Sequence, residues 1–345
     1  MFHHSKTAFQ MTVLAATVAL LAGCGGSDDN SSSSNTPAPA AKTQPVQIEF
    51  VAMAGDLRIN CGDTITNLGT TNASAKLRDL RFYASDIHLI DANDKEVPVT
   101  LSSSEWQRDG VVLVDLEDGT DVCNTQGTAK VNAKIIGTVP AGTYTGVGYT
   151  VGLPLKQNHS DWNAESAPLD VQAMAWSWQS GRKMLKIEVN PTDGVIRPAN
   201  TAANGTVTPA VTQSTFNIHL GSTGCTGTNP SVGVVDTCAR FNKMAFHSHN
   251  FNANTQRLAI DVRSLLADSN INQDLNGPFG CMSGATDPEC AAIFEQLKIN
   301  LTNGQPIDGG HGQSLFKVVP KSGALATDGT ATTTPTTDTE QHNHS

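Results

Sequence analysis

Residues 80–91, LRFYASDIHLID, form the stretch of this sequence that decides its fold class. The run is short, it is rich in Leu, Ile, Phe and Tyr, and turn residues separate it from the next such run, as is typical of β-strands. Long helical periodicity is almost absent, so the chain predicts an all-β protein: a β-sandwich-like single domain with long loops and disulfides. Seven further runs predict strands: 45–55, 110–118, 141–154, 183–189, 214–222, 256–262 and 314–320. Two segments predict short helices: 262–268 and 290–297.

The first 23 residues are interpreted as a lipoprotein signal peptide. Lys6 precedes the apolar run MTVLAATVALLA (11–22), whose twelve residues are too few for a membrane span, which needs about 20. The run ends in LAGC (21–24), which resembles a bacterial lipobox, so Cys24 is predicted to be lipidated. An ordinary signal peptide followed by a chance Cys is the alternative. Because Gly25 rather than Asp follows the lipobox, we expect an outer-membrane protein.

Both flanks of the domain have compositions that cannot bury a core. Residues 24–44 are rich in Ser, Asn, Pro and Ala and predict a disordered tether. Residues 321–345 are rich in Thr, contain His342 and His344, and predict a disordered tail. The folded domain is therefore expected to span 45–320. The net charge of the chain is −10, which argues against a nucleic-acid partner.

Six cysteines remain once Cys24 is set aside, and an even number in an exported chain predicts disulfides. Many connectivities are possible, and proximity along the chain favours two local pairs and leaves a third. A thiolate metal site is the alternative, but the local pairs enclose twelve and eight residues, unlike the short CxxC spacing of zinc sites. The expected pairs are Cys225/Cys238, Cys281/Cys290 and Cys61/Cys123.

Histidines are the candidate metal ligands, because imidazole suits Cu, Zn, Fe and Ni. Strand alternation places His88 on the same face as Asp86. His219 lies opposite the apolar face of its own strand. His247 and His249 form an HxH pair, which a strand would aim to one side, although the surrounding sequence is polar and a loop is the alternative. A structural or surface role is the alternative for any single His.

Residues 158–189, NHSDWNAESAPLDVQAMAWSWQSGRKMLKIEV, concentrate aromatic residues in a chain that has few of them. Three of its four Trp lie here, Trp162, Trp176 and Trp178, and His159 precedes them. Trp176 and Trp178 share a face if the segment is extended, so filling of the core is one explanation for them.

The order of these segments resembles the MbnP-like family of periplasmic copper-binding proteins, described as the four-Cys half of a "metallo-mystery pair". NH, AMAWSWQSG and HLGSTGC in this order carry the resemblance, which covers essentially the whole expected domain. It implies a β-sandwich-like protein that binds copper. It also implies a partner related to the di-haem cytochrome c peroxidases of the MauG type, which oxidises a Trp to kynurenine beside His ligands. The matching segments are 77–90, 111–123, 137–154, 158–189, 216–225, 281–290 and 312–316.

Carried onto this chain, the resemblance makes His159 and His219 copper ligands. It makes Trp176 or Trp178 the oxidised residue, while Trp162 matches the motif less closely. The chain departs from the pattern after WQSG, where Arg and Met stand in place of the Tyr and Phe of many relatives.

The family motif gives no ligand role to His88. Strand geometry alone makes it a candidate third ligand, with Asp86 expected to orient the other nitrogen of its ring.

Together these observations predict a lipid-anchored, exported copper-binding protein with a role in copper acquisition or handling, and not an enzyme. The alternative is a metal-free surface binding module, in which Trp residues stack on a carbohydrate or a protein. Metal analysis of protein from copper-supplemented cells distinguishes the two.

Overall fold

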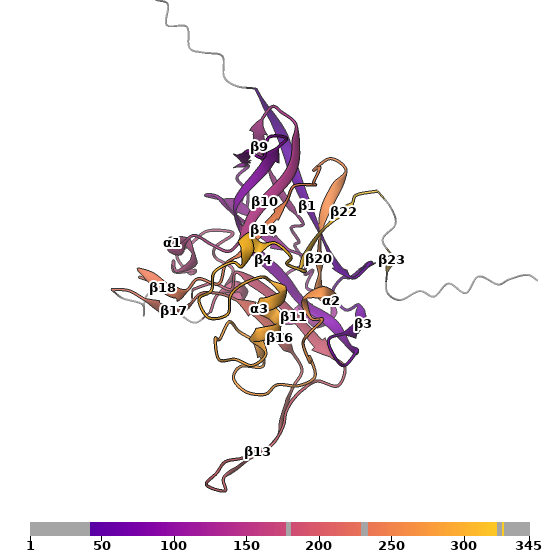
Figure 1. Ribbon diagram of the computed structural model, residues 1–345, viewed down its shortest axis with the longest axis vertical. Helices are drawn as coiled ribbons and strands as arrows, with labels where there is room; N and C mark the ends of the chain where they lie inside the picture. The colour runs from indigo at the N-terminus through magenta and orange to yellow at the C-terminus, as the bar shows by residue number, and fades with distance from the viewer. Residues whose placement is uncertain (1–41, 177–180, 229–233, 323–325, 328–345) are drawn as a thin grey trace, which may run out of the picture. The chain divides into compact units, whose positions relative to one another are not determined.

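Two β-sheets form the domain in the computed structural model, which describes residues 42–176, 181–228, 234–322 and 326–327 (Figure 1). The smaller sheet has the order β22-β20-β1-β2-β23, with β9 beside β1 and β6 beside β9. Its strands are β1 (Thr43–Ala54), β2 (Leu57–Arg58), β6 (Thr100–Leu101), β9 (Lys134–Pro140), β20 (Gln256–Asp261), β22 (Phe316–Pro320) and β23 (Ala326–Thr327).

The larger sheet has the order β19-β10-β4-β11-β16-β21, and β3, β5 and β8 also pair with the long strand β4. Strand β7 pairs with β8. The strands of this sheet are β3 (Thr64–Leu68), β4 (Ala73–Asp91), β5 (Glu96–Pro98), β7 (Gln107–Arg108), β8 (Val111–Asp115), β10 (Tyr144–Val151), β11 (Leu185–Pro191), β16 (Phe216–Leu220), β19 (Met244–Ser248) and β21 (Gly280–Cys281).

Short hairpins and helices complete the described part of the chain. The hairpins are β12 (Val195–Arg197) with β15 (Val211–Gln213), β13 (Asn200–Thr201) with β14 (Val207–Thr208), and β17 (Thr223–Thr226) with β18 (Thr237–Arg240). The α-helices are α1 (Leu155–Asn158), α2 (Val262–Leu265) and α3 (Cys290–Gln296), and the 3₁₀ turns are η1 (Asp121–Thr125), η2 (Gln172–Met174) and η4 (Asp308–Gly310). Within the described residues, no helix is long and apolar enough to cross a membrane.

An aromatic cluster joins the two sheets. Phe50 of β1 lies 5.3 Å, between ring centroids, from Phe82 of β4. Phe316 of β22 lies 5.4 Å from Phe82 and 5.5 Å from Tyr149 of β10. Phe50 and Phe316 belong to the smaller sheet, and Phe82 and Tyr149 belong to the larger one. Edge-to-face pairs of this kind add about 0.5–1.5 kcal/mol each beyond their buried area, so the cluster holds the sheets together.

Three disulfides are present, in the pairs that proximity along the chain predicted. Cys225 and Cys238 link the hairpin strands β17 and β18, and the other bridges are Cys281–Cys290 and Cys61–Cys123. Each bridge is expected to stabilise the fold by about 2–4 kcal/mol. Disulfides are typical of proteins that mature in an oxidising compartment.

The all-β prediction is confirmed, and each of the eight predicted strand runs contains a strand. Both predicted helices form, as α2 and α3. The first described strand, β1, begins at Thr43, and the last, Ala326–Thr327, pairs in parallel with β2. The signal peptide, Cys24, His342 and His344 lie outside the described residues.

Candidate metal centre

Three neighbouring strands of the larger sheet carry a row of polar side chains on the face turned away from the core. In the strand register Lys186 of β11 lies between Arg81 of β4 and His219 of β16. Side chains alternate between the faces of a sheet, so the neighbouring Ile187 and Ile218 enter the core instead. Arg81, Lys186 and His219 are nevertheless buried, because loops cover this outer face.

Buried ion pairs connect this row to the neighbouring row on the same face, which contains Asp79 of β4 and Glu188 of β11. The Lys186 ammonium lies 2.6 Å from Asp79 and 3.3 Å from Glu188, and the Arg81 guanidinium also pairs with Asp79. Burial alone would raise the pKa of Glu188. Hydrogen bonding from His219 and the charge of Lys186 instead lower that pKa to about 2. Glu188 is therefore a fixed anion beneath the histidine.

His219 is held in a single orientation by this anion. Its Nε2 lies 2.8 Å from Glu188 Oε1, and the residue is 5% exposed. Burial lowers the pKa of His219 in spite of the hydrogen bond to Glu188, so the neutral imidazole donates from Nε2. Its Nδ1 is buried and has no hydrogen-bond partner among the described residues. A carboxylate that fixes one ring nitrogen and leaves the other free is the usual arrangement around a metal-ligating His.

His159, the second histidine of the resemblance, lies at the end of α1. Its Nε2 lies 3.1 Å from Asn158 Nδ2, and 3.4 Å and 3.7 Å from the sulfurs of Cys238 and Cys225. These sulfurs form a disulfide, so they are packing partners here and not thiolate ligands. Because Asn158 Nδ2 can only donate, Nε2 is the acceptor nitrogen, and the protonated Nδ1 is buried without a partner among the described residues. Burial and the positive charge of Arg182 lower the pKa of His159, which keeps it neutral.

Hydrogen bonds attach the loop of His159 to the end of β16. The Asn158 side chain donates to Ser222 Oγ at 3.2 Å and accepts from the backbone N–H of Arg182 at 3.0 Å. The Arg182 guanidinium is 1% exposed and donates to the carbonyl of Leu169 at 2.6 Å and to that of Ser160 at 3.1 Å. Arg182, which departs from the family pattern, thus holds the covering loop in place.

Trp176 lies next to His219. The two ring centroids are 6.5 Å apart, with an angle of 55° between the ring planes. Residue 221 must be Gly, because a Cβ there would lie 2.3 Å from Trp176 Cζ3. Trp176 and the half-buried Trp162 also line an open groove of about 810 Å³, together with Lys183. Trp178 lies outside the described residues.

His88 is not brought to this centre. Arg81 is level with His219 across the sheet, and His88 lies seven residues further along β4, roughly 20 Å at about 3.3 Å per residue. The expectation that the Asp86 carboxylate orients His88 is corrected: the Asp86 backbone carbonyl, 2.9 Å from Nδ1, does so. Asp86 has a positive φ of 52°, which breaks the strand alternation, so its side chain is exposed.

The HxH pair is also divided. The ring centroid of His247, on β19, lies 5.5 Å from that of His88. His249 follows the strand, is exposed, and faces Asp94 at 3.2 Å. The two imidazoles of the motif therefore have different partners.

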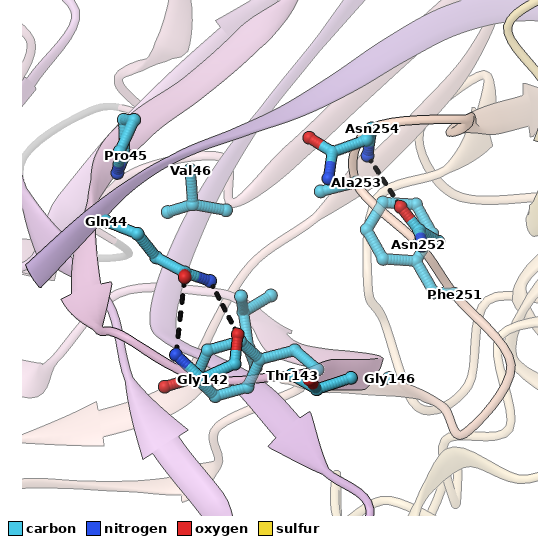
Figure 2. Close-up of a pocket in the computed structure, with 12 residues that line it drawn as sticks. Gln44, Pro45, Val46, Gly142, Thr143, Gly146, Phe251, Asn252, Ala253 and Asn254 are labelled. Carbon is cyan, nitrogen blue, oxygen red and sulfur yellow. Dashed lines mark hydrogen bonds between the residues drawn. The ribbon is translucent and has the colours of Figure 1, made fainter.

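Figure 2 shows a separate pocket between the start of β1, the turn before β10 and the loop after β19, with a volume of about 280 Å³. The Gln44 side chain exchanges two hydrogen bonds with the backbone of Gly142, at 3.0 and 3.2 Å. Asn252 Oδ1 accepts from the backbone N–H of Asn254 at 2.9 Å. None of the described residues that line this pocket is His, Cys, Asp or Glu, so it offers no strong metal ligand.

Sequence reasoning missed the residues that support the two histidines. Glu188 and Lys186 alternate with apolar residues in β11, a pattern that usually indicates a solvated face. Asn158 and Ser222 are common loop residues, and only the fold places them beside the imidazoles. The sequence signal for this part of the site was the family resemblance around His159, where the motif contains Asn followed directly by His.

The fold and the two buried neutral imidazoles define a class of disulfide-linked β proteins with a candidate metal centre, and the disulfides are consistent with export to an oxidising compartment. The family model MbnP matches residues 43–283. The solved structure of MbnP from Methylosinus trichosporium is 34% identical, covers 81% of this chain and 100% of its own, and gives a TM-score of 0.71. A search of curated proteins found no match. The chain belongs to the MbnP family.

The two buried histidines predict a pH dependence of stability in the metal-free protein. Burial lowers both pKa values, so below about pH 6.5 the unfolded chain binds protons that the folded chain does not, and the unfolding free energy falls. The contribution is fully present above the unfolded pKa and is lost as the pH falls through the folded pKa. Asp115 affects the unfolding free energy with the opposite sign. Burial raises its pKa to about 8, so its contribution to stability increases as the pH falls below about 8.

Urea unfolding between about pH 8 and pH 5 of the wild type and of His159→Ala/His219→Ala measures this dependence, since the difference between them cancels Asp115. The wild type is expected to lose more stability on acidification than the variant. Equal slopes would show that neither imidazole is kept neutral by the fold.

Proposed function

We propose that this protein binds one copper ion through His159 and His219 and acts in copper acquisition or handling, without being an enzyme itself. The observation that carries the proposal is the buried Nδ1 of His219, which has no described partner while Glu188 fixes the other ring nitrogen. Leaving such an acceptor unsatisfied is costly, and a metal ion would satisfy it. His219 would bind through Nδ1, and His159 would bind through Nε2 in exchange for its contact with Asn158.

Several features favour copper over other metals. Copper binds nitrogen ligands more tightly than the other divalent first-row metals do. All six cysteines of the domain are in disulfides, which leaves imidazole as the donor type at this centre. Membership of the MbnP family and the likeness to MbnP from Methylosinus trichosporium add support.

We further propose that Trp176 is the residue oxidised to kynurenine, by a di-haem peroxidase-like partner whose cofactor supplies the oxidation chemistry. Its indole lies beside the proposed ligand His219 and lines an open groove, which supports access by a partner. The indole ring opens and its C2 carbon leaves as formate: tryptophan, O₂ and water give kynurenine and formic acid, with O₂ (or two equivalents of peroxide) as the oxidant that the partner activates.

Mass spectrometry tests this assignment. Co-expression with the di-haem partner is expected to add about 4 Da to the peptide that contains residues 176–178. Trp176→Phe is expected to abolish the addition, whereas the matched change Trp178→Phe should leave it. The reverse pattern would move the assignment to Trp178, and an addition without the partner would contradict the role of the partner.

Cys24 is proposed to carry the lipid that anchors the protein to the outer membrane, on the ground of its lipobox and of the disulfides of an exported domain. One lipidated Cys with more than one acyl chain anchors stably. The wild type is expected in the detergent-released membrane fraction and Cys24→Ser in the soluble fraction. Recovery of both proteins from the membrane would exclude this anchor.

A metal-free binding module is the second candidate, and the groove with two Trp side chains favours it, because indoles in an open groove can stack on a ligand. Metal analysis of protein purified from copper-supplemented cells separates the two functions. About one equivalent of copper supports the metal centre, and metal-free protein supports the module.

A further inference from the structure

A second pair of imidazoles faces one glycine at another place on the larger sheet. In the register of strands β4, β10 and β19, Gly148 lies directly between His88 and His247. Residues level with each other on neighbouring strands share one face of the sheet, so both rings lie over the glycine. A Cβ at residue 148 would lie 2.3 Å from His88 Nε2 and 2.7 Å from His247 Cδ2, so glycine leaves the room that the two rings need.

The hydrogen bonds of the two rings leave their Nε2 atoms available. His88 Nδ1 lies 2.9 Å from the backbone carbonyl of Asp86, which makes Nδ1 the protonated nitrogen. His88 Nε2 is buried and has no hydrogen-bond partner among the described residues. His247 Nδ1 faces the carbonyl of Gly309 at 3.4 Å, which directs its other nitrogen away from that loop. Backbone carbonyls fix the tautomer of metal-ligating histidines in the same manner.

A carboxylate completes the cluster. Glu96 of β5 lies next to β4, and its Oε1 is 3.5 Å from His88 Nε2. One ligand atom each from His88, Glu96 and His247 fits within a mutual distance of 4.8 Å. The His88 side chain is 12% exposed and that of Glu96 is 61% exposed, so the cluster opens to solvent on the carboxylate side.

We propose that His88, His247 and Glu96 form a second metal site, which takes a divalent ion of borderline softness, Zn²⁺ or Cu²⁺. Two imidazoles and one carboxylate are a donor set that suits both ions. Three protein ligands leave a coordination position open to water or to an incoming ligand, as in zinc sites that exchange ligands. The site lies roughly 20 Å along β4 from His219, so it is separate from the proposed copper centre.

Zinc titration of the full mature chain tests the site. All proteins carry His342→Ala and His344→Ala, so that the C-terminal imidazoles do not contribute. One equivalent of Zn²⁺ is expected to disappear in His88→Ala/His247→Ala and to persist in the matched control His249→Ala, whose side chain is 58% exposed and faces Asp94. Zinc binding that survives the double change, or an equal loss in the control, would overturn the proposal.

Three further measurements keep the test decisive. The same zinc equivalent is expected with His159 and His219 intact and with both replaced by Ala, which separates this site from the copper centre. Glu96→Gln, at an exposed side chain, is expected to weaken Zn²⁺ binding by at least about tenfold, and it decides the matter if the His double variant does not fold. In the His159→Ala/His219→Ala background, electron paramagnetic resonance of bound Cu²⁺ should show nitrogen couplings that His88→Ala/His247→Ala removes. Unchanged affinity in Glu96→Gln or unchanged couplings would contradict the assignment.

Discussion

His159→Ala combined with His219→Ala is expected to reduce copper from about one equivalent to less than about a tenth of an equivalent, because both proposed ligands are lost. The two residues lie 60 positions apart in the sequence, so the centre exists only in the folded domain. Copper is measured in protein purified from copper-supplemented cells. Both proteins carry His88→Ala, so that the second site does not contribute.

The control variant is His249→Ala, at an exposed imidazole that contacts neither proposed ligand in the described structure. It is expected to keep the full copper content. Circular dichroism should show the same β spectrum for all variants, since neither histidine belongs to the core between the sheets. A folded double variant that retains one equivalent of copper would make these histidines structural and would leave the copper centre elsewhere.

Lys186→Met is expected to lower the unfolding free energy by about 3–5 kcal/mol, the usual effect of removing one partner from a buried ion pair. Lys186 is fully buried and lies within 3.3 Å of both Asp79 and Glu188. Methionine fills a similar volume but leaves those carboxylates with less compensating charge. Urea unfolding with a linear extrapolation measures the change.

Lys130→Met is the matched control. Its ammonium pairs with Glu105 at 2.7 Å, but the two side chains are 69% and 53% exposed. A pair of this kind contributes about 0–1 kcal/mol, so the control should change stability little. If Lys186→Met costs no more than Lys130→Met, the buried network does not stabilise the sheet face beneath His219.

The strands were predictable where apolar side chains repeat and turn residues separate the runs, as in residues 80–91. Strands β9 and β19 were missed, because KIIGTVP contains Gly and Pro and MAFHS leads into a polar loop. A glycine in a strand usually indicates a bulge or a close approach, and Gly137 indeed packs against the backbone of Thr100.

The candidate site was predictable only through the resemblance. Sequence reasoning grouped His88 with the copper ligands because it can specify the face of a strand but not the position of that strand in the sheet. The distance between His88 and His219 depends on which strands pair and in which register. The exposed Asp86 illustrates a second limit, because a single residue with positive φ is enough to break the alternation.

The contact between His159 and the Cys225–Cys238 bridge has a consequence for the order of maturation. In the oxidised chain the two sulfurs are bonded to each other. The imidazole of His159 is therefore the metal donor at this place. The same fold with the bridge reduced would surround His159 with two thiols, a softer donor set that captures Zn²⁺ and Cu⁺. The compartment in which the Cys225–Cys238 disulfide forms would therefore decide whether a metal ion meets thiols or only imidazole at His159. If the Cys225–Cys238 bridge forms before a metal ion arrives, the His159 imidazole stays available to the copper ion proposed above.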